Sequence, residues 1–146
     1  MYKVKNNKLY KYRYLLVLIF LFGSFLILKE IKKRNNVKLK INEIKEKFEG
    51  VIVEKFSVRN TPPTHLRIKN EYGFIEISPN QEIVLKANTG DSIIKMENEN
   101  FVYLITKQGA KTKYFYTRLS NETRNSKYFP KEWKKLWYES SKWDND

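Results

Sequence analysis

Residues 14–28 read YLLVLIFLFGSFLIL, a run of fifteen residues without a charged side chain. As an α-helix this run is about 22 Å long. Extending it to residues 9–31 gives roughly 34 Å, which is enough to cross a hydrocarbon core of about 30 Å. Tyr12 and Tyr14 would lie at one membrane interface, where aromatic rings are favoured. Because a domain this small can hardly bury a helix that is apolar on every face, the run predicts a transmembrane segment over residues 14–31.

The flanks of this segment indicate an anchor that stays in place. It is followed by KEIKKR at residues 29–34, without the small residues that signal peptidase requires. Five basic residues precede the run and six lie in residues 29–40, so the positive-inside rule does not decide the orientation. A short basic tail, residues 1–13, before a larger C-terminal part favours a domain on the outer side of a bacterial cytoplasmic membrane.

The net charge of +13 belongs mostly to this end of the chain. Residues 1–40 hold eleven basic and one acidic side chain, a net charge of +10. The other 106 residues hold 18 basic and 15 acidic side chains, a net charge of +3. A nearly balanced domain disfavours nucleic acid as a partner and favours the lipid bilayer as the partner of the basic end.

Catalytic and metal-binding chemistry finds little support in the composition. The chain has no cysteine and a single histidine, His65, which excludes disulfides, thiol nucleophiles and cysteine-ligated zinc. It contains no glycine-rich phosphate loop and no serine-hydrolase or zinc-protease motif. We therefore expect no enzyme activity, no catalytic residue, no metal and no cofactor, with His65 as a surface or cap residue.

Residues 32–49 predict a basic connector at the membrane surface. Ile41, Ile44 and Phe48 fall on one helical face. Asn35-Asn36 is a candidate break between this short helix and the membrane helix. Its lysines suit anionic headgroups better than a specific ligand.

From residue 50 to residue 119 the pattern changes to that of a β domain. Short β-branched and aromatic runs alternate with Gly, Pro, Asn and Asp turns. The expected strands are 50–59, 65–69, 74–77, 82–86, 92–96, 101–106 and 112–117. Together they predict an antiparallel, barrel-like sheet of the OB or SH3 kind. The expected core residues are Ile68, Ile75, Ile77, Ile83, Leu85, Ile93, Val102, Leu104 and Phe115.

Residues 120–146 predict an aromatic C-terminal helix and tail. Pro130 suits the first turn of a helix, and Trp133, Leu136, Trp137 and Ser140 would form one stripe. That stripe would pack on the sheet, or Trp133 and Trp137 would touch the membrane interface.

One strand face is a candidate ligand surface. Basic and aromatic side chains alternate around residues 111–118, as they do in proteins that stack nucleobases on aromatic rings. Cross-strand pairing explains the same pattern without a ligand. The candidate face consists of Tyr103, Lys107, Lys113, Tyr114, Tyr116 and Arg118.

Two motifs carry a family resemblance: Phe48-Glu49-Gly50-Val51-Ile52, and Gly90-Asp91-Ser92-Ile93-Ile94-Lys95 about forty residues later. They resemble the F-x-G-x-[VI] strand and the GDS[IL]-x-K turn of small membrane-anchored proteins of Bacteroidota-type bacteria. The resemblance covers roughly residues 48–118 and implies no catalytic residues, because that group has no assigned activity.

These observations favour a non-enzymatic interaction or structural module of the cell envelope, with an envelope protein or a polyanion as partner. The alternative is a periplasmic binding domain for a glycan or anionic polymer, using the aromatic and basic strand face.

Overall fold

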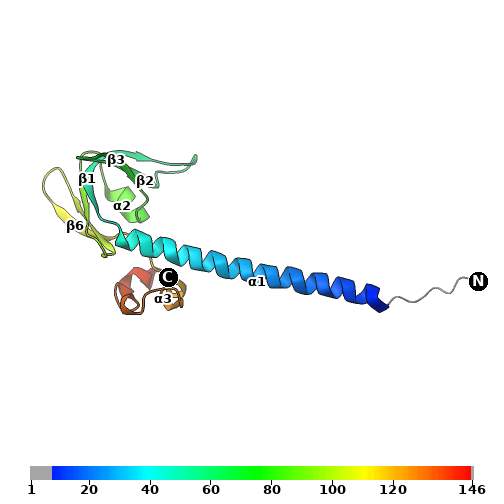
Figure 1. Ribbon diagram of the computed structural model, residues 1–146. Helices are drawn as coiled ribbons and strands as arrows, with labels where there is room; N and C mark the ends of the chain where they lie inside the picture. Colours follow the sequence, from blue (N-terminus) through cyan, green and yellow to red (C-terminus); the bar gives the residue numbers. More distant parts are fainter. Residues whose placement is uncertain (1–7, 146) are drawn as a thin grey trace, which may run out of the picture. The chain divides into compact units, whose positions relative to one another are not determined.

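The computed structural model describes residues 8–145, and the side chains of residues 12–141 (Figure 1). The chain divides into two compact units, with the boundary after Asn36. Helix α1, Lys8–Lys45, begins in the first unit and ends in the second. It continues through Asn35-Asn36, so the break that the sequence suggested there is absent from the secondary structure.

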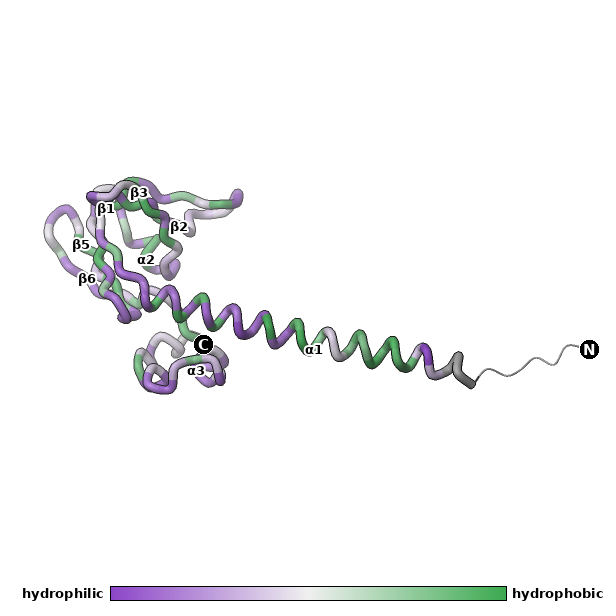
Figure 2. The backbone as a smooth tube through the Cα atoms, in the orientation of Figure 1, coloured by the Kyte–Doolittle hydropathy of each residue, from purple (hydrophilic) through white to green (hydrophobic). Residues whose placement is uncertain are grey.

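In the first unit α1 exposes the apolar run on every side. The large hydrophobic side chains between Tyr14 and Leu28 are 49–76% exposed. Figure 2 shows most of the run as hydrophobic, with one paler section between the green turns of α1. By length and composition, α1 can cross a membrane, and the single apolar helix predicted near the N-terminus is present.

The second unit is built on one antiparallel sheet, with its strands in the order β3-β2-β1-β4-β5-β6. The two outermost strands, β3 and β6, each pair with only one neighbour, so the sheet formed by the described residues is open. The antiparallel sheet is confirmed, but the barrel-like closure is wrong. The strands are β1 Phe48–Phe56, β2 His65–Asn70, β3 Gly73–Ile77, β4 Ser92–Lys95, β5 Phe101–Ile105 and β6 Lys111–Phe115.

The fourth of the seven expected strands, residues 82–86, is a short helix, so the sheet has six strands. Residues 81–86 form α2, Gln81–Lys86, and the side chain of Asn80 caps it by accepting from the backbone N–H of Glu82. A strand would bury alternate residues. The chain instead buries Ile83 and Val84 side by side and leaves Leu85 68% exposed, so Leu85 was wrongly predicted as a core residue.

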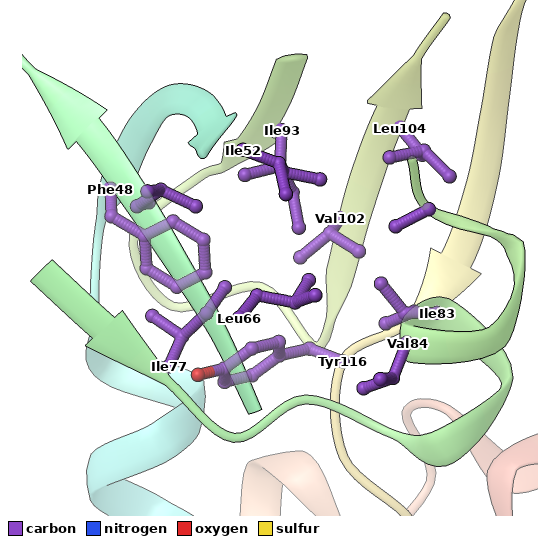
Figure 3. Packing of buried hydrophobic residues seen from close by; sticks show 12 residues of the cluster. Phe48, Ile52, Leu66, Ile77, Ile83, Val84, Ile93, Val102, Leu104 and Tyr116 are labelled. Atoms are coloured by element: carbon purple, nitrogen blue, oxygen red, sulfur yellow. The ribbon is translucent and has the colours of Figure 1, made fainter. Parts of the chain in front are cut away.

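The main core lies between the sheet and α2 (Figure 3). Leu66, Ile52 and Val102 from three strands are fully buried there with Ile83 of α2. Ile75 is partly buried at its margin. The predicted core residues that are buried in this cluster are Ile68, Ile77, Ile83, Ile93, Val102 and Leu104.

A second cluster joins the end of α1 to the C-terminal segment. Val37 and Ile44 of α1 pack with Leu119, Phe129 and Trp137. Ile41, Phe101, Phe115, Tyr128 and Trp133 are partly buried against them. The prediction that Ile41 and Ile44 share one apolar face of a helix is therefore confirmed. Phe48, which was predicted to share that face, instead begins β1 and lies in the main core.

The C-terminal segment is not the predicted helix. It forms α3, Asn121–Asn125, and two 3₁₀ segments, Lys131–Trp133 and Tyr138–Asn145. Trp137 adopts a φ of 53°, which interrupts any helix between Leu136 and Tyr138. The carbonyl of Leu136 accepts instead from Arg124 Nη2 at 2.6 Å.

Gly50 is required where β1 approaches β2. A Cβ atom at this position would lie 2.6 Å from the backbone oxygen of Lys69. We expect Gly50→Ala to lower the free energy of unfolding by about 2 kcal/mol, the range of an overpacked site. Gly23→Ala is the control, because a Cβ there meets no atom within 4 Å. Equal thermal unfolding of the two variants would show that β1 can move away from β2.

Candidate functional site

The two faces of β5 and β6 separate the residues of the predicted ligand surface. Tyr103 lies opposite Lys113, whereas Tyr114 lies opposite Val102. Directly opposite residues share a face and successive residues alternate. Tyr103 and Lys113 therefore lie on the outer face, away from the core, while Tyr114 lies on the core side.

Tyr116 is not available to a ligand on that surface. It is 2% exposed and belongs to the main core, where its ring meets Phe48 edge-on at 5.4 Å. Tyr114 is partly buried against the same core. The combined Tyr103, Tyr114 and Tyr116 face predicted from the sequence is therefore wrong, because strand alternation sends its members to opposite sides.

The other two predicted face residues lie outside the strands. Lys107 is in the β5–β6 turn, with its side chain beside Gly90 and its backbone N–H donating to Asp91 at 3.2 Å. Arg118 is exposed beyond the end of β6. Neither residue joins Tyr103 and Lys113 on the outer face of a strand.

On the outer face, basic side chains lie over aromatic rings. Lys111 Nζ is 4.1 Å from the ring centre of Tyr103, and Lys113 Nζ is 3.7 Å from that of Phe101. On the other half of the face, Lys69 lies 5.9 Å from the ring of Phe74. Such stacking keeps each ammonium group at the surface while its stem covers apolar area.

A hollow of about 450 Å³ lies on the same face, lined by Val53, Glu54, Arg67 and Phe74. Arg67 Nη2 binds Glu76 at 2.9 Å, and Arg67 Nη1 binds Glu54. Phe74 is 63% exposed at its rim. The hollow is thus apolar at Val53 and Phe74, and its one cation is held between two carboxylates.

The lysine of the GDSI-x-K motif has a structural position that the sequence reasoning missed. Lys95 is fully buried, and its Nζ donates to the carbonyls of Ile44 at 2.8 Å and Glu46 at 2.6 Å. Ile44 lies in the last turn of α1, whose carbonyls lack partners within the helix. Lys95 therefore fixes the end of α1 to the sheet.

Asp91 of the same motif has a comparable role. It is 3% exposed, and its carboxylate accepts from the backbone N–H groups of Asn88 and Lys107. Gly90 supplies a φ of 93° in this turn. The motif thus closes the α2–β4 turn and ties it to the β5–β6 turn. The position of Lys95 two residues after the core residue Ile93, and so on the same face of β4, is the one sequence signal of its inward direction.

The electrostatics around Lys95 are dominated by burial. Desolvation lowers the pKa of Lys95 to about 8, against the opposing effect of Glu46. Desolvation also raises the pKa of Tyr116, whose ring centre lies 5.2 Å from Lys95 Nζ. The pKa of Glu46 is raised by desolvation and by nearby Glu43. Lys95 of β4 is thus coupled electrostatically to Glu43 of α1 and to Glu46, just after α1. Tyr116, just after β6, is coupled to the same two glutamates.

The other residues predicted to be functional lie outside β5 and β6. His65 Nδ1 lies 2.8 Å from Thr64 Oγ1, and its ring packs on Phe56. Tyr12 and Tyr14 are exposed on α1. Trp133 and Trp137 pack against each other within the second cluster, so Trp137, at 9% exposure, does not present a surface to a membrane. Within residues 12–141, no group of three or more His, Asp or Glu side chains is arranged to hold a metal.

Comparison with known proteins adds no relative. No family model matches the chain, and neither a curated protein nor a solved structure gives a significant match.

Proposed function

We propose that the chain is a single-pass membrane protein that presents its sheet domain as a non-enzymatic interaction module of the cell envelope. The observation that carries this proposal is the exposed apolar run of α1, from Tyr14 to Leu28. Burying this surface in hydrocarbon is favourable by roughly 25 cal/mol per Å². Lipid is the environment that such a helix requires.

The membrane is proposed to be the bacterial cytoplasmic membrane, with the sheet domain on its outer side. Support comes from the resemblance of residues 48–118 to small membrane-anchored proteins of Bacteroidota-type bacteria. Lys29, Lys32, Lys33 and Arg34 lie directly after the apolar run. They would contact anionic headgroups.

An interaction role is supported by the open sheet. Its outer face carries stacked lysines and an exposed Phe74, whereas its inner face is filled by α2 and the core. Exposed apolar side chains gathered on one face of a small domain are typical of interaction sites. The glycan-binding alternative depended on Tyr114 and Tyr116, which point away from this face, so it is not retained.

The test is membrane extraction of the unmodified chain. Membranes from expressing bacteria are washed with alkaline carbonate and separated by ultracentrifugation. We expect the chain to remain in the pellet with integral proteins. Release into the supernatant with peripheral proteins would overturn the proposal.

A further inference from the structure

The outer face carries a strip of apolar side chains that belongs to neither packed cluster. Val51, Ile94, Tyr103 and Ile105 are absent from both clusters, and Val51 is 43% exposed. We call these four residues with Ser92, which lies among them, the outer strip. Phe101 and Phe115, on the same face of β5 and β6, pack with the second cluster. The strip is therefore the part of this face that lies outside the packed clusters.

The strand register places a lysine at each end of the strip. Val51 is opposite Lys69 on one side and Ser92 on the other. Ser92 is opposite Ile105, which is opposite Lys111. Lys69 and Lys111 are therefore four strand spacings apart in one row, about 19 Å at roughly 4.8 Å per strand.

These lysines differ from the arginine beside them. Among the ion pairs of the described residues, Arg67 is held between Glu54 and Glu76, but Lys69, Lys111 and Lys113 have no carboxylate within ion-pair distance. The row from Lys69 to Lys111 contains no acidic residue, and Glu49, beside Ile94, is the carboxylate nearest to the strip in the register. The row thus has a lysine at each end, with Val51 and Ile105 on either side of Ser92 between them.

This combination separates two classes of partner. A polyanion such as a nucleic acid or an anionic polysaccharide would bind the lysines but gain little from Val51, Ile94 and Ile105. A protein segment can place its own apolar side chains on the strip and carboxylates on the lysines. The hollow at Val53 and Phe74 offers a further apolar contact for such a segment.

We propose that the outer strip binds an extended segment of a partner protein, with apolar side chains on Val51 and Ile105 and acidic side chains on Lys69 and Lys111. This inference rests on the proposed role as an interaction module and names its partner class. An extended chain advances about 3.3 Å per residue. Two acids six residues apart would therefore span about 20 Å and match the distance between the two lysine positions.

The test uses defined peptides and the full chain in detergent. The probe is fluorescent acetyl-ETLTLTE-amide, in which the two acids and the two leucines share one face. Its comparison peptides are ETSTSTE, which lacks the apolar side chains, and KTLTLTK, which reverses the charge. Binding is followed by fluorescence anisotropy. We expect ETLTLTE to bind at least tenfold more tightly than either comparison peptide.

Charge reversal on the protein locates the site. We expect the double variant Lys69→Glu/Lys111→Glu to lose ETLTLTE and to prefer KTLTLTK. Lys86→Glu, an exposed lysine on α2, should bind as the unmodified chain does. Thermal unfolding of each variant shows whether the fold is retained.

The outcomes that overturn the inference are distinct. Equal binding of ETSTSTE would indicate a polyanion site, and binding that survives the double variant would place the site elsewhere. Absence of binding by all three peptides would also overturn it. Membrane extraction is independent of these results, so the anchored-module proposal can stand when the peptide inference fails.

Discussion

The double variant Leu18→Lys/Phe22→Lys is expected to lose at least nine-tenths of its carbonate-resistant membrane fraction. Both side chains are more than 60% exposed in the middle of the apolar run, on one side of α1. A lysine at the centre of a transmembrane helix costs about 3 kcal/mol on insertion scales, so two cost roughly 6 kcal/mol. The measurement is immunoblotting of the washed membrane pellet against total protein.

The matched control is Leu39→Lys. Leu39 is 60% exposed on the same helix but lies eleven residues beyond Leu28, outside the apolar run. It should leave membrane association unchanged. If Leu39→Lys releases the chain as well as the double variant does, general misfolding rather than loss of the anchor is responsible.

Lys95→Met is expected to lower the free energy of unfolding of the sheet domain by about 2–3 kcal/mol at pH 7. Methionine retains most of the apolar stem but cannot donate to the carbonyls of Ile44 and Glu46. Buried acceptors left without a donor cost about 1–3 kcal/mol each, and removing a desolvated charge offsets part of that loss. Chemical denaturation in detergent measures the difference. Lys86→Met, on the exposed side of α2, should be neutral, and equal stabilities of the two variants would contradict the role given to Lys95.

The pKa of Lys95 makes the same comparison depend on pH. The folded chain has a pKa of about 8 at this residue, below the ordinary lysine value of 10.5. Between pH 8 and pH 10 the unfolded chain therefore binds more protons, and this lysine makes stability rise with pH by up to about 2 kcal/mol. The window stops below pH 10, where Tyr116 would begin to contribute in the unfolded chain. We expect the rise to be missing from Lys95→Met, and a parallel rise in both proteins would contradict the assignment.

Features with a long or regular pattern were predictable from the sequence. The apolar run of α1 could be recognised without knowledge of the rest of the fold, because its composition alone predicts a lipid environment. The six strands were also recognisable, because turns such as Asn70 to Gly73 separate them cleanly. Prediction failed where consecutive residues are all apolar and show no periodicity. Ile83, Val84 and Leu85 fit a strand as well as a helix. In the structure Ile83 and Val84 are both buried, as one face of a helix allows and an alternating strand does not.

The candidate site was less predictable, for physical reasons. Alternation along β6 places Tyr114 and Lys113 on opposite faces of the sheet. Which of these faces packs on the core depends on the strand order, and the local sequence does not encode that order. The backbone turn at Trp137 replaces the predicted helix, and the spacing of the tryptophans gives no sign of it. The spacing of Lys95 from Ile93 places it on the core face of β4, but a lysine is ordinarily solvent-facing. Its burial is favourable only because the carbonyls of Ile44 and Glu46, at the end of α1, accept from it.

Thiol labelling from the two sides of the membrane tests the central claim most directly. The chain has no cysteine, so each single cysteine variant supplies one thiol. Tyr12→Cys places it at an exposed position before the apolar run. Ser57→Cys places it at a half-exposed position in the β1–β2 loop. Thr89→Cys, also exposed, is a second reporter on the domain.

Intact cells, with only the outer membrane permeabilised where one is present, are treated with a membrane-impermeant maleimide before and after full lysis. We predict that Ser57→Cys and Thr89→Cys react before lysis and that Tyr12→Cys reacts only after it, which places the ends of the apolar run on opposite sides of the membrane. Reaction of Tyr12→Cys and Ser57→Cys from the same side would contradict a spanning helix and the anchored-module account with it.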